Sequence, residues 1–118
     1  MRTLPGSPRL ASSRIACTWA KPGGIKRVAV MDYDGRNLRA VSPEGVLALY
    51  PAWFPDGSRI AYVTYRQSRP EIVAQSLTTG QVRSLAFFPG LNAFPQISPD
   101  GKQMLLFFND TANTEIYA

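Results

Sequence analysis

The sequence predicts an all-β fold, a partial β-propeller of about two and a half four-stranded antiparallel blades in an incomplete ring. The first observation behind this prediction is a phrase that occurs twice, at residues 51–57 and again 44 residues later at 95–101. The second is that each copy leads into an apolar run, at 60–63 and at 104–108. A phrase that returns at this spacing indicates an array of one repeated supersecondary unit.

The complete unit contains four runs with the composition of strands. They are rich in Val, Ile, Tyr and Phe, are separated by Pro, Gly, Asp and Ser, and span 49–54, 59–65, 71–76 and 82–88. The second run is apolar without clean alternation, so we expect its strand to be buried on both faces between two other sheets. Strand-like runs elsewhere in the chain predict three strands before this unit and three after it.

Each copy of the repeated phrase ends in turn residues, Pro55-Asp56-Gly57 and Pro99-Asp100-Gly101. Proline presets φ for the second turn position, aspartate can accept hydrogen bonds from nearby backbone amides, and glycine accepts the left-handed conformation. The two phrases therefore predict hairpin turns in two neighbouring blades.

The repeat divides the chain into a linker or lead-in segment, 1–13, and a propeller segment, 14–118, with blades at about 14–48, 49–92 and 93–118. The run Arg14-Ile15-Ala16-Cys17 echoes Arg59-Ile60-Ala61-Tyr62, which marks the first, partial copy. A ring needs at least about four blades, so we expect a piece of a longer protein or a truncated gene product. The rival fold is a β-sandwich, which also has short, regularly spaced strands.

Composition narrows the classes of partner. The net charge is +5, but the 13 Lys and Arg residues are scattered, so we expect solvated blade edges and no nucleic-acid partner. No apolar stretch is long enough for a transmembrane helix, so no direct membrane insertion is expected. The single cysteine, Cys17, allows no disulfide within the chain.

The sequence contains little catalytic or metal-binding chemistry. It has no histidine, which excludes Ser-His-Asp and Cys-His arrangements within the chain, and no Gly-rich phosphate loop. The turn Asp32-Tyr33-Asp34-Gly35 is faintly similar to a calcium loop but lacks the further ligands. We therefore predict no catalytic, cofactor-binding or metal-binding residues, and no enzyme.

The segment 87–94 is the candidate for a partner site. It joins the outer strand of one blade to the inner strand of the next, and it carries the apolar Leu91 and Phe94 beside the polar Asn92. Apolar anchors on a surface loop indicate a protein partner. The alternative is that Phe88 and Phe94 fill the gap between two blades, and the residues alone do not decide between the two.

Nearly the whole chain resembles the propeller domain of the TolB family of the Tol-Pal system. The similarity lies in residues 4–6, the turn at 31–37, the two phrases 51–57 and 95–101, and the junction 88–92. Phe54 stands where the family usually has serine.

The resemblance implies a non-enzymatic periplasmic scaffold for protein–protein interaction, which serves outer-membrane integrity, cell division and protein transport. The implied partners are a Pal-like peptidoglycan-associated lipoprotein and other Tol proteins. The Pal-facing loop of the family matches Pro89, Gly90, Leu91, Asn92 and Phe94. The family usually has a small residue where Phe94 stands, and a bulky ring there would alter that docking.

The residues are also compatible with two other functions. Similar repeats form the propeller of prolyl-oligopeptidase-like serine peptidases, whose Gly-x-Ser-x-Gly nucleophile would lie outside this chain. A generic ligand-binding propeller is the third possibility.

Overall fold

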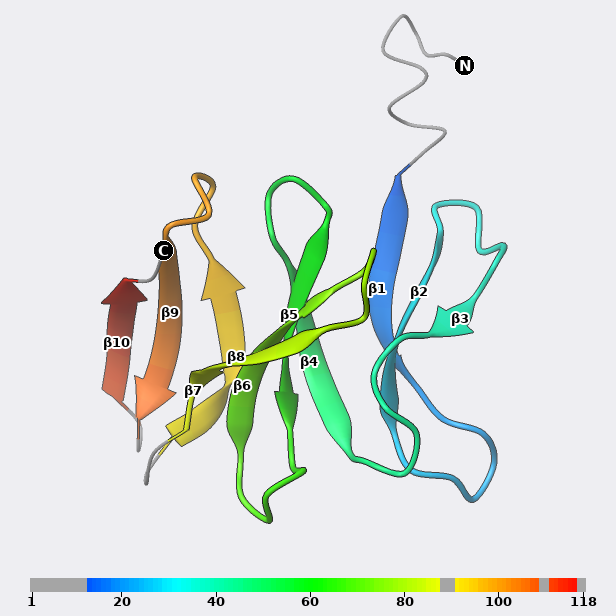
Figure 1. Ribbon diagram of the computed structural model, residues 1–118, viewed down its shortest axis with the longest axis horizontal. Coiled ribbons are helices and arrows are strands. Elements are labelled where there is room, and N and C mark those ends of the chain that lie inside the picture. Colours follow the sequence, from blue (N-terminus) through cyan, green and yellow to red (C-terminus); the bar gives the residue numbers. More distant parts are fainter. Residues whose placement is uncertain (1–12, 88–90, 109–110, 117–118) are drawn as a thin grey trace, which may run out of the picture.

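Strands form all the regular secondary structure in the described part of the chain, as the computed structural model in Figure 1 shows. The structure describes residues 13–87, 91–108 and 111–116. Within these ranges the strands are β1 (Arg14–Trp19), β2 (Arg27–Asp32), β3 (Arg39–Ala40), β4 (Ala48–Trp53), β5 (Arg59–Thr64), β6 (Glu71–Ser76), β7 (Val82–Ala86), β8 (Leu91–Ile97), β9 (Gln103–Phe108) and β10 (Thr111–Ile116).

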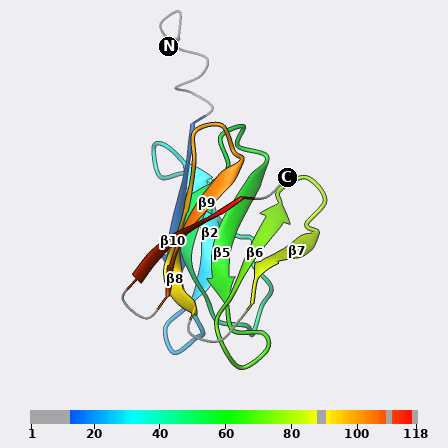
Figure 2. The ribbon, with the colours of Figure 1, turned by 90° about the vertical axis from the view of Figure 1, so that its left-hand side faces the viewer.

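The strands form three antiparallel sheets, in the orders β1-β2-β3, β4-β5-β6-β7 and β10-β9-β8. We call them the first, middle and third sheets. Their three, four and three strands agree with the prediction, and the fold class is confirmed as all-β, open and incomplete. Figure 2 shows the third sheet in front of the middle one, so the sheets are stacked rather than joined edge to edge.

The middle sheet is buried on both faces, as the apolar run 59–65 predicts. Ile60 and Tyr62 of β5 pack with Val28 and Val30 of the first sheet. Val63, the next residue along β5, lies in a second cluster with Met104 of the third sheet. Successive side chains of a strand point to opposite faces, so one continuous apolar run supplies both interfaces.

The third sheet begins earlier than the sequence predicts. Leu91, Asn92 and Phe94, expected in a loop, lie within β8, because Leu91 pairs with Phe108 and Asn92 with Phe107 of β9. The expectation of a loop at these three residues is therefore wrong. The sheets start at Arg14, Ala48 and Leu91, and the division into blades stays a prediction.

The register of β10 also departs from the repeat. Thr64 pairs with Glu71 in the middle sheet, so the 44-residue offset would pair Phe108 with Glu115. In the structure Glu115 pairs with Met104 instead. Only two residues separate β9 from β10, against six between β5 and β6, so the shorter connection shifts the register by four residues.

No helix in the described ranges is long and apolar enough to span a membrane.

Candidate partner-binding face

The connections between strands gather at two ends of the stacked sheets. Residues 20–26, 41–47 and 65–70 join β1 to β2, β3 to β4 and β5 to β6 at the lower end in Figure 1, and we call these three segments the connection face. The guanidinium carbon of Arg69 lies 4.5 Å from the ring centroid of Phe87, which follows β7. The start of the β7–β8 connection therefore lies against the connection face, whereas the Pro-Asp-Gly turns lie at the upper end.

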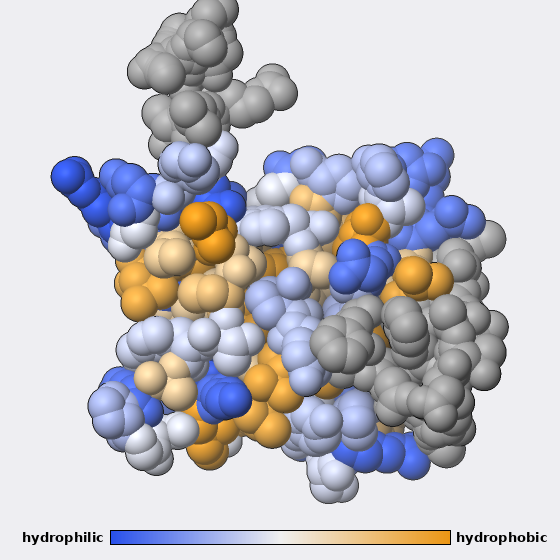
Figure 3. All heavy atoms as spheres, turned by 180° about the vertical axis from the view of Figure 1, so that it is seen from behind, coloured by the Kyte–Doolittle hydropathy of each residue, from blue (hydrophilic) through white to orange (hydrophobic). Residues whose placement is uncertain are grey.

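An open groove of about 740 Å³ crosses the connection face between the first and middle sheets. Its walls combine apolar side chains with the ends of two cationic ones: Ile25, Lys26, Val46, Leu47, Leu49 and Arg66. Ile25 is 50% exposed, whereas Val46, Leu47 and Leu49 are half-buried. Seen from behind in Figure 3, the lower end mixes apolar and hydrophilic residues, while hydrophilic residues dominate the upper corners.

Ser42 anchors the β3–β4 connection beside this groove. Its side chain is fully buried, and its Oγ accepts a hydrogen bond from the Val28 amide at 2.9 Å. The Arg27 guanidinium donates through Nε and Nη2 to the Ser42 carbonyl, at 3.1 and 2.6 Å. Because a buried polar group is costly when unpaired, these bonds hold the connection in one position.

A second chain of hydrogen bonds ties the same connection to the middle sheet. The Tyr62 hydroxyl donates to Gln75 Oε1 at 2.6 Å, and Gln75 Nε2 donates to the Val41 carbonyl at 2.7 Å. Burial raises the pKa of Tyr62 to about 12, so its hydroxyl stays a neutral donor at physiological pH. The groove wall therefore rests on both sheets and is pre-organised.

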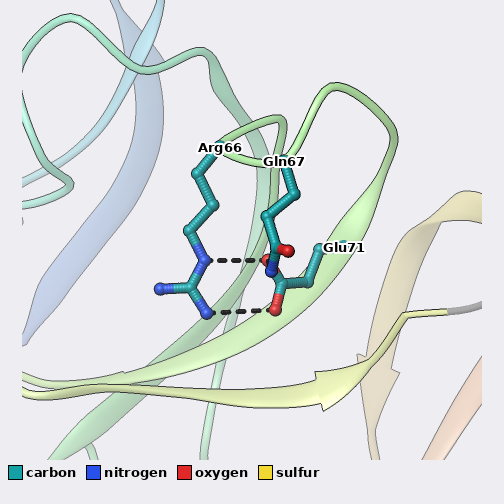
Figure 4. Close-up of polar contacts among 3 residues, drawn as sticks. All are labelled: Arg66, Gln67 and Glu71. Carbon is teal, nitrogen blue, oxygen red and sulfur yellow. Dashed lines mark hydrogen bonds and ion pairs between the residues drawn. The ribbon is translucent and has the colours of Figure 1, made fainter.

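The β5–β6 connection is held by an ion pair, shown in Figure 4. Arg66 donates to Glu71 through Nε at 2.8 Å and Nη2 at 3.0 Å, and Gln67 Nε2 donates to the same carboxylate at 3.3 Å. The Arg66 guanidinium holds the pKa of Glu71 below its usual range, although burial acts in the opposite direction. The side chain of Glu71 is 1% exposed, so the pair fixes Arg66 at the rim of the groove.

The residues predicted as partner contacts lie partly outside the described residues. Pro89 and Gly90 fall there, while Leu91, Asn92 and Phe94 belong to β8. The sequence reasoning missed the groove itself. The feature of the sequence that could have indicated the groove is apolar residues in connections, where polar residues are usual. These are Ile25 after a Gly-Gly pair, and Val46-Leu47 after Gly45.

A second cavity, of about 580 Å³, lies at the opposite end beside the 54–57 turn. Arg14 spans it, with its Nη2 donating to the Gly57 carbonyl at 2.9 Å and its guanidinium carbon 5.1 Å from the Trp53 ring centroid. Trp53 packs half-buried against the core between the first and middle sheets. Arg14 therefore joins two neighbouring sheets, which explains this cavity as a structural junction.

The carboxylates of the acidic turn after β2 accept hydrogen bonds from residues of the same turn. Asn37 Nδ2 donates to Asp32 Oδ2 at 2.6 Å, and the Arg36 amide donates to Asp34 Oδ1 at 3.0 Å. Across the described ranges, no group of three or more His, Cys, Asp or Glu residues is placed to hold a metal ion.

Comparison with known proteins gives concordant results. Residues 2–118 match the family described as TolB beta propeller domain (PD40). The chain is 40% identical over 91 residues to the Tol-Pal system protein TolB of Nitrosomonas europaea, which covers 77% of this chain and 21% of that protein. The crystal structure of TolB from Acinetobacter baumannii matches with a TM-score of 0.76 and 38% identity, over 91% of this chain and 28% of that one.

A more distant structure matches in fold alone. The acylaminoacyl peptidase of Pyrococcus horikoshii has a TM-score of 0.52 and 18% identity, over 79% of this chain and 14% of that one. The chain spans about a fifth of the length of the curated relative. The match over residues 2–118 and the identity to TolB proteins together show that this chain belongs to the TolB beta propeller domain family.

Proposed function

We propose that this chain is part of a non-enzymatic periplasmic scaffold of the Tol-Pal system and that its connection face binds a protein partner. A Pal-like peptidoglycan-associated lipoprotein is the partner that the family implies, together with other Tol proteins. Support comes from the family match and from the relative named a Tol-Pal system protein. The alternative of a peptidase propeller has a likeness of fold behind it and nothing more specific.

The observation that carries this proposal is the way several connections meet on one face. The connections of the first and middle sheets line one groove, and Arg69 against Phe87 brings the start of the β7–β8 connection beside them. Hydrogen bonds hold the β3–β4 connection, and the Arg66–Glu71 pair holds the β5–β6 connection, so binding would require little ordering of these two segments. A fixed, partly apolar surface of this kind suits protein docking.

Within this proposal, Leu91, Asn92 and Phe94 contribute to the partner surface at the adjoining end of β8. Their place at the start of β8, immediately after the β7–β8 connection, supports this assignment. Pro89 and Gly90 complete the proposed contact set. The aromatic residue at 94 is proposed to adapt the surface to the partner of this particular protein.

The test is the affinity of the complete protein for its cognate Pal-like lipoprotein, measured by isothermal titration calorimetry. We expect Leu91→Ala and Phe94→Ala each to weaken binding by about tenfold, because apolar anchors dominate interface energies. Leu38→Ala is the matched control, since Leu38 is exposed and lies in the β2–β3 connection, outside the connection face. No measurable affinity of the complete protein would refute the proposed function. Affinity that neither substitution alters would refute only the site.

A further inference from the structure

We propose that the groove of the connection face binds a segment of the partner protein that combines an apolar side chain with carboxylates. The apolar side chain would lie between Ile25, Leu47 and Leu49, and the carboxylates would bind Lys26 and Arg66. Glu71 acts as a positioning residue for Arg66. This inference rests on the proposed function, because it assumes that the segment is part of the protein partner that binds the connection face.

The shape of the groove supports an inserted side chain. Its walls come from segments that are hydrogen-bonded to one another through the backbone, with the Ala48 amide donating to the Lys26 carbonyl at 3.0 Å. The Tyr65 amide donates to the Leu47 carbonyl at 3.1 Å, so the β5–β6 side is joined as well. A groove of about 740 Å³ is large enough to accept an apolar side chain, and its hydrogen-bonded walls keep the conformational cost low.

The charge of the groove selects the kind of segment. Lys26 and Arg66 are the charged residues that line it, and no carboxylate is among its lining residues. The adjoining cavity adds Lys21 and Arg27 and a single acid, Glu44. A cationic rim around an apolar surface attracts an acidic segment and repels a basic one.

Arg66 and Lys26 contribute in different ways. The charge of Arg66 is balanced by Glu71, so Lys26 supplies the net positive charge of the groove. Arg66 Nε and Nη2 bind Glu71, and Figure 4 shows the third guanidinium nitrogen turned away from that carboxylate. Arg66 therefore offers a directed donor at a fixed position, which a free arginine side chain would not.

An apolar segment without carboxylates would fit less well. Its docking would bury the Lys26 ammonium and the outer Arg66 donor without partners, which costs free energy. A carboxylate on the segment removes that cost and adds a charge-assisted hydrogen bond. The geometry therefore favours an acidic, apolar segment over a purely apolar one.

The test is fluorescence anisotropy with the complete protein and a short labelled peptide that alternates glutamate with leucine. A second peptide carries glutamine in place of glutamate. We expect the acidic peptide to bind with a dissociation constant below about 1 mM and the glutamine peptide to bind about tenfold more weakly. Added salt should narrow this difference, because it screens exposed charges.

Variants assign the effect to the groove. Lys26→Glu should weaken binding of the acidic peptide by about tenfold, and Lys26→Arg should retain it. Lys102→Glu is the matched control, since it makes the same charge change on an exposed lysine at the opposite end. Glu71→Gln removes the charge that balances Arg66, so binding of the acidic peptide should depend more steeply on salt while binding of the glutamine peptide should not, a difference that a general loss of folding would not produce.

Three results would overturn this inference: no binding of the acidic peptide up to about 1 mM, equal affinity for both peptides, or no effect of Lys26→Glu. A failure of this inference can be distinguished from a failure of the proposed function. If the lipoprotein binds normally to Lys26→Glu, the groove assignment falls and the scaffold function stands. If the acidic peptide binds the groove while the lipoprotein does not bind at all, the scaffold function falls and the groove assignment stands.

Discussion

The two copies of the Pro-Asp-Gly turn have the same backbone but differ in the residue that precedes them. The Gly57 amide donates to the Phe54 carbonyl at 3.0 Å, and the Gly101 amide donates to the Ser98 carbonyl at 2.9 Å. Both glycines have φ of +74°, a conformation that residues with a Cβ rarely adopt. The backbone of the turn is therefore set by Pro-Asp-Gly and does not depend on position 54 or 98.

In each turn a serine hydroxyl donates to the aspartate, but this serine precedes the aspartate in one copy and follows it in the other. In the second copy Ser98 Oγ donates to Asp100 Oδ1 at 2.6 Å and accepts from the Gln103 amide at 3.0 Å. In the first copy Ser58, two residues after the aspartate, donates its Oγ to Asp56 Oδ1 at 2.8 Å. Each carboxylate thus keeps a hydroxyl partner, although only one copy has serine before the proline.

Because Ser58 supplies the hydroxyl in the first copy, the residue at position 54 can pack in the core instead. Phe54 is 2% exposed and lies with Ala61 and Ala74 against Ile97 of the third sheet. The Arg59 guanidinium carbon lies 4.0 Å from its ring centroid. The comparison teaches that one repeat position can pack between two sheets in one copy and serve the turn in the next.

The largest expected effect is that of Phe54→Ala. We expect the free energy of unfolding to fall by about 3–5 kcal/mol, because a buried aromatic ring is replaced by a cavity between two sheets. Urea unfolding followed by circular dichroism measures this change. Tyr33→Ala is the control, since Tyr33 is 62% exposed, and it should cost less than about 0.5 kcal/mol. Equal costs for the two variants would contradict the assigned packing role.

A smaller effect is expected for Ser98→Ala, about 1 kcal/mol, because Asp100 and the Gln103 amide each lose a hydrogen bond. Adding Lys102→Ser to this variant places a hydroxyl where Ser58 stands in the first copy. The same urea measurement should show partial recovery in the double variant and little gain from Lys102→Ser alone. Absence of recovery would show that the two sources of the hydroxyl are not equivalent.

The smallest effects concern protonation. Hydrogen bonds lower the pKa of Asp56, chiefly through the Ser58 amide, and that of Asp100, chiefly through the Ser98 hydroxyl, below the usual 3.8. Because both folded values are lowered, the stability that they contribute is present above the unfolded pKa and is lost as pH falls through the folded one. Carboxyl chemical shifts followed by NMR during a pH titration report each value separately.

The hydroxyl variants should therefore differ in this titration. Ser98→Ala removes the main cause at Asp100 and should raise that pKa clearly, whereas Ser58→Ala keeps the backbone amide and should raise the pKa of Asp56 less. Neither substitution should change the other aspartate. A larger rise in the pKa of Asp56 than in that of Asp100 would contradict the expectation that the serine hydroxyl matters more at Asp100.

Much of the fold could be predicted from consecutive residues. The turn phrases place the hairpins before β5 and β9, and the uninterrupted apolar run at 60–63 indicates burial on both faces. The candidate site could be predicted only in part. Pro89, Gly90 and Asn92 suggested a loop that carries Leu91 and Phe94, yet Leu91 and Asn92 pair with β9 and begin a strand, because cross-strand hydrogen bonds outweigh the low strand propensity of asparagine.

The sequence by itself determined the repeat, the number of strands in each sheet and the chemistry of both turns, because each is evident from short runs of consecutive residues and the spacing between them. Only the tertiary structure decided the register of β10, the burial of Phe54 and the groove. The groove forms where Lys26, Leu47 and Arg66, distant along the chain, meet at one end of two stacked sheets. Apolar residues in the connections indicate exposed apolar surface, but the place where they meet depends on how the sheets pack.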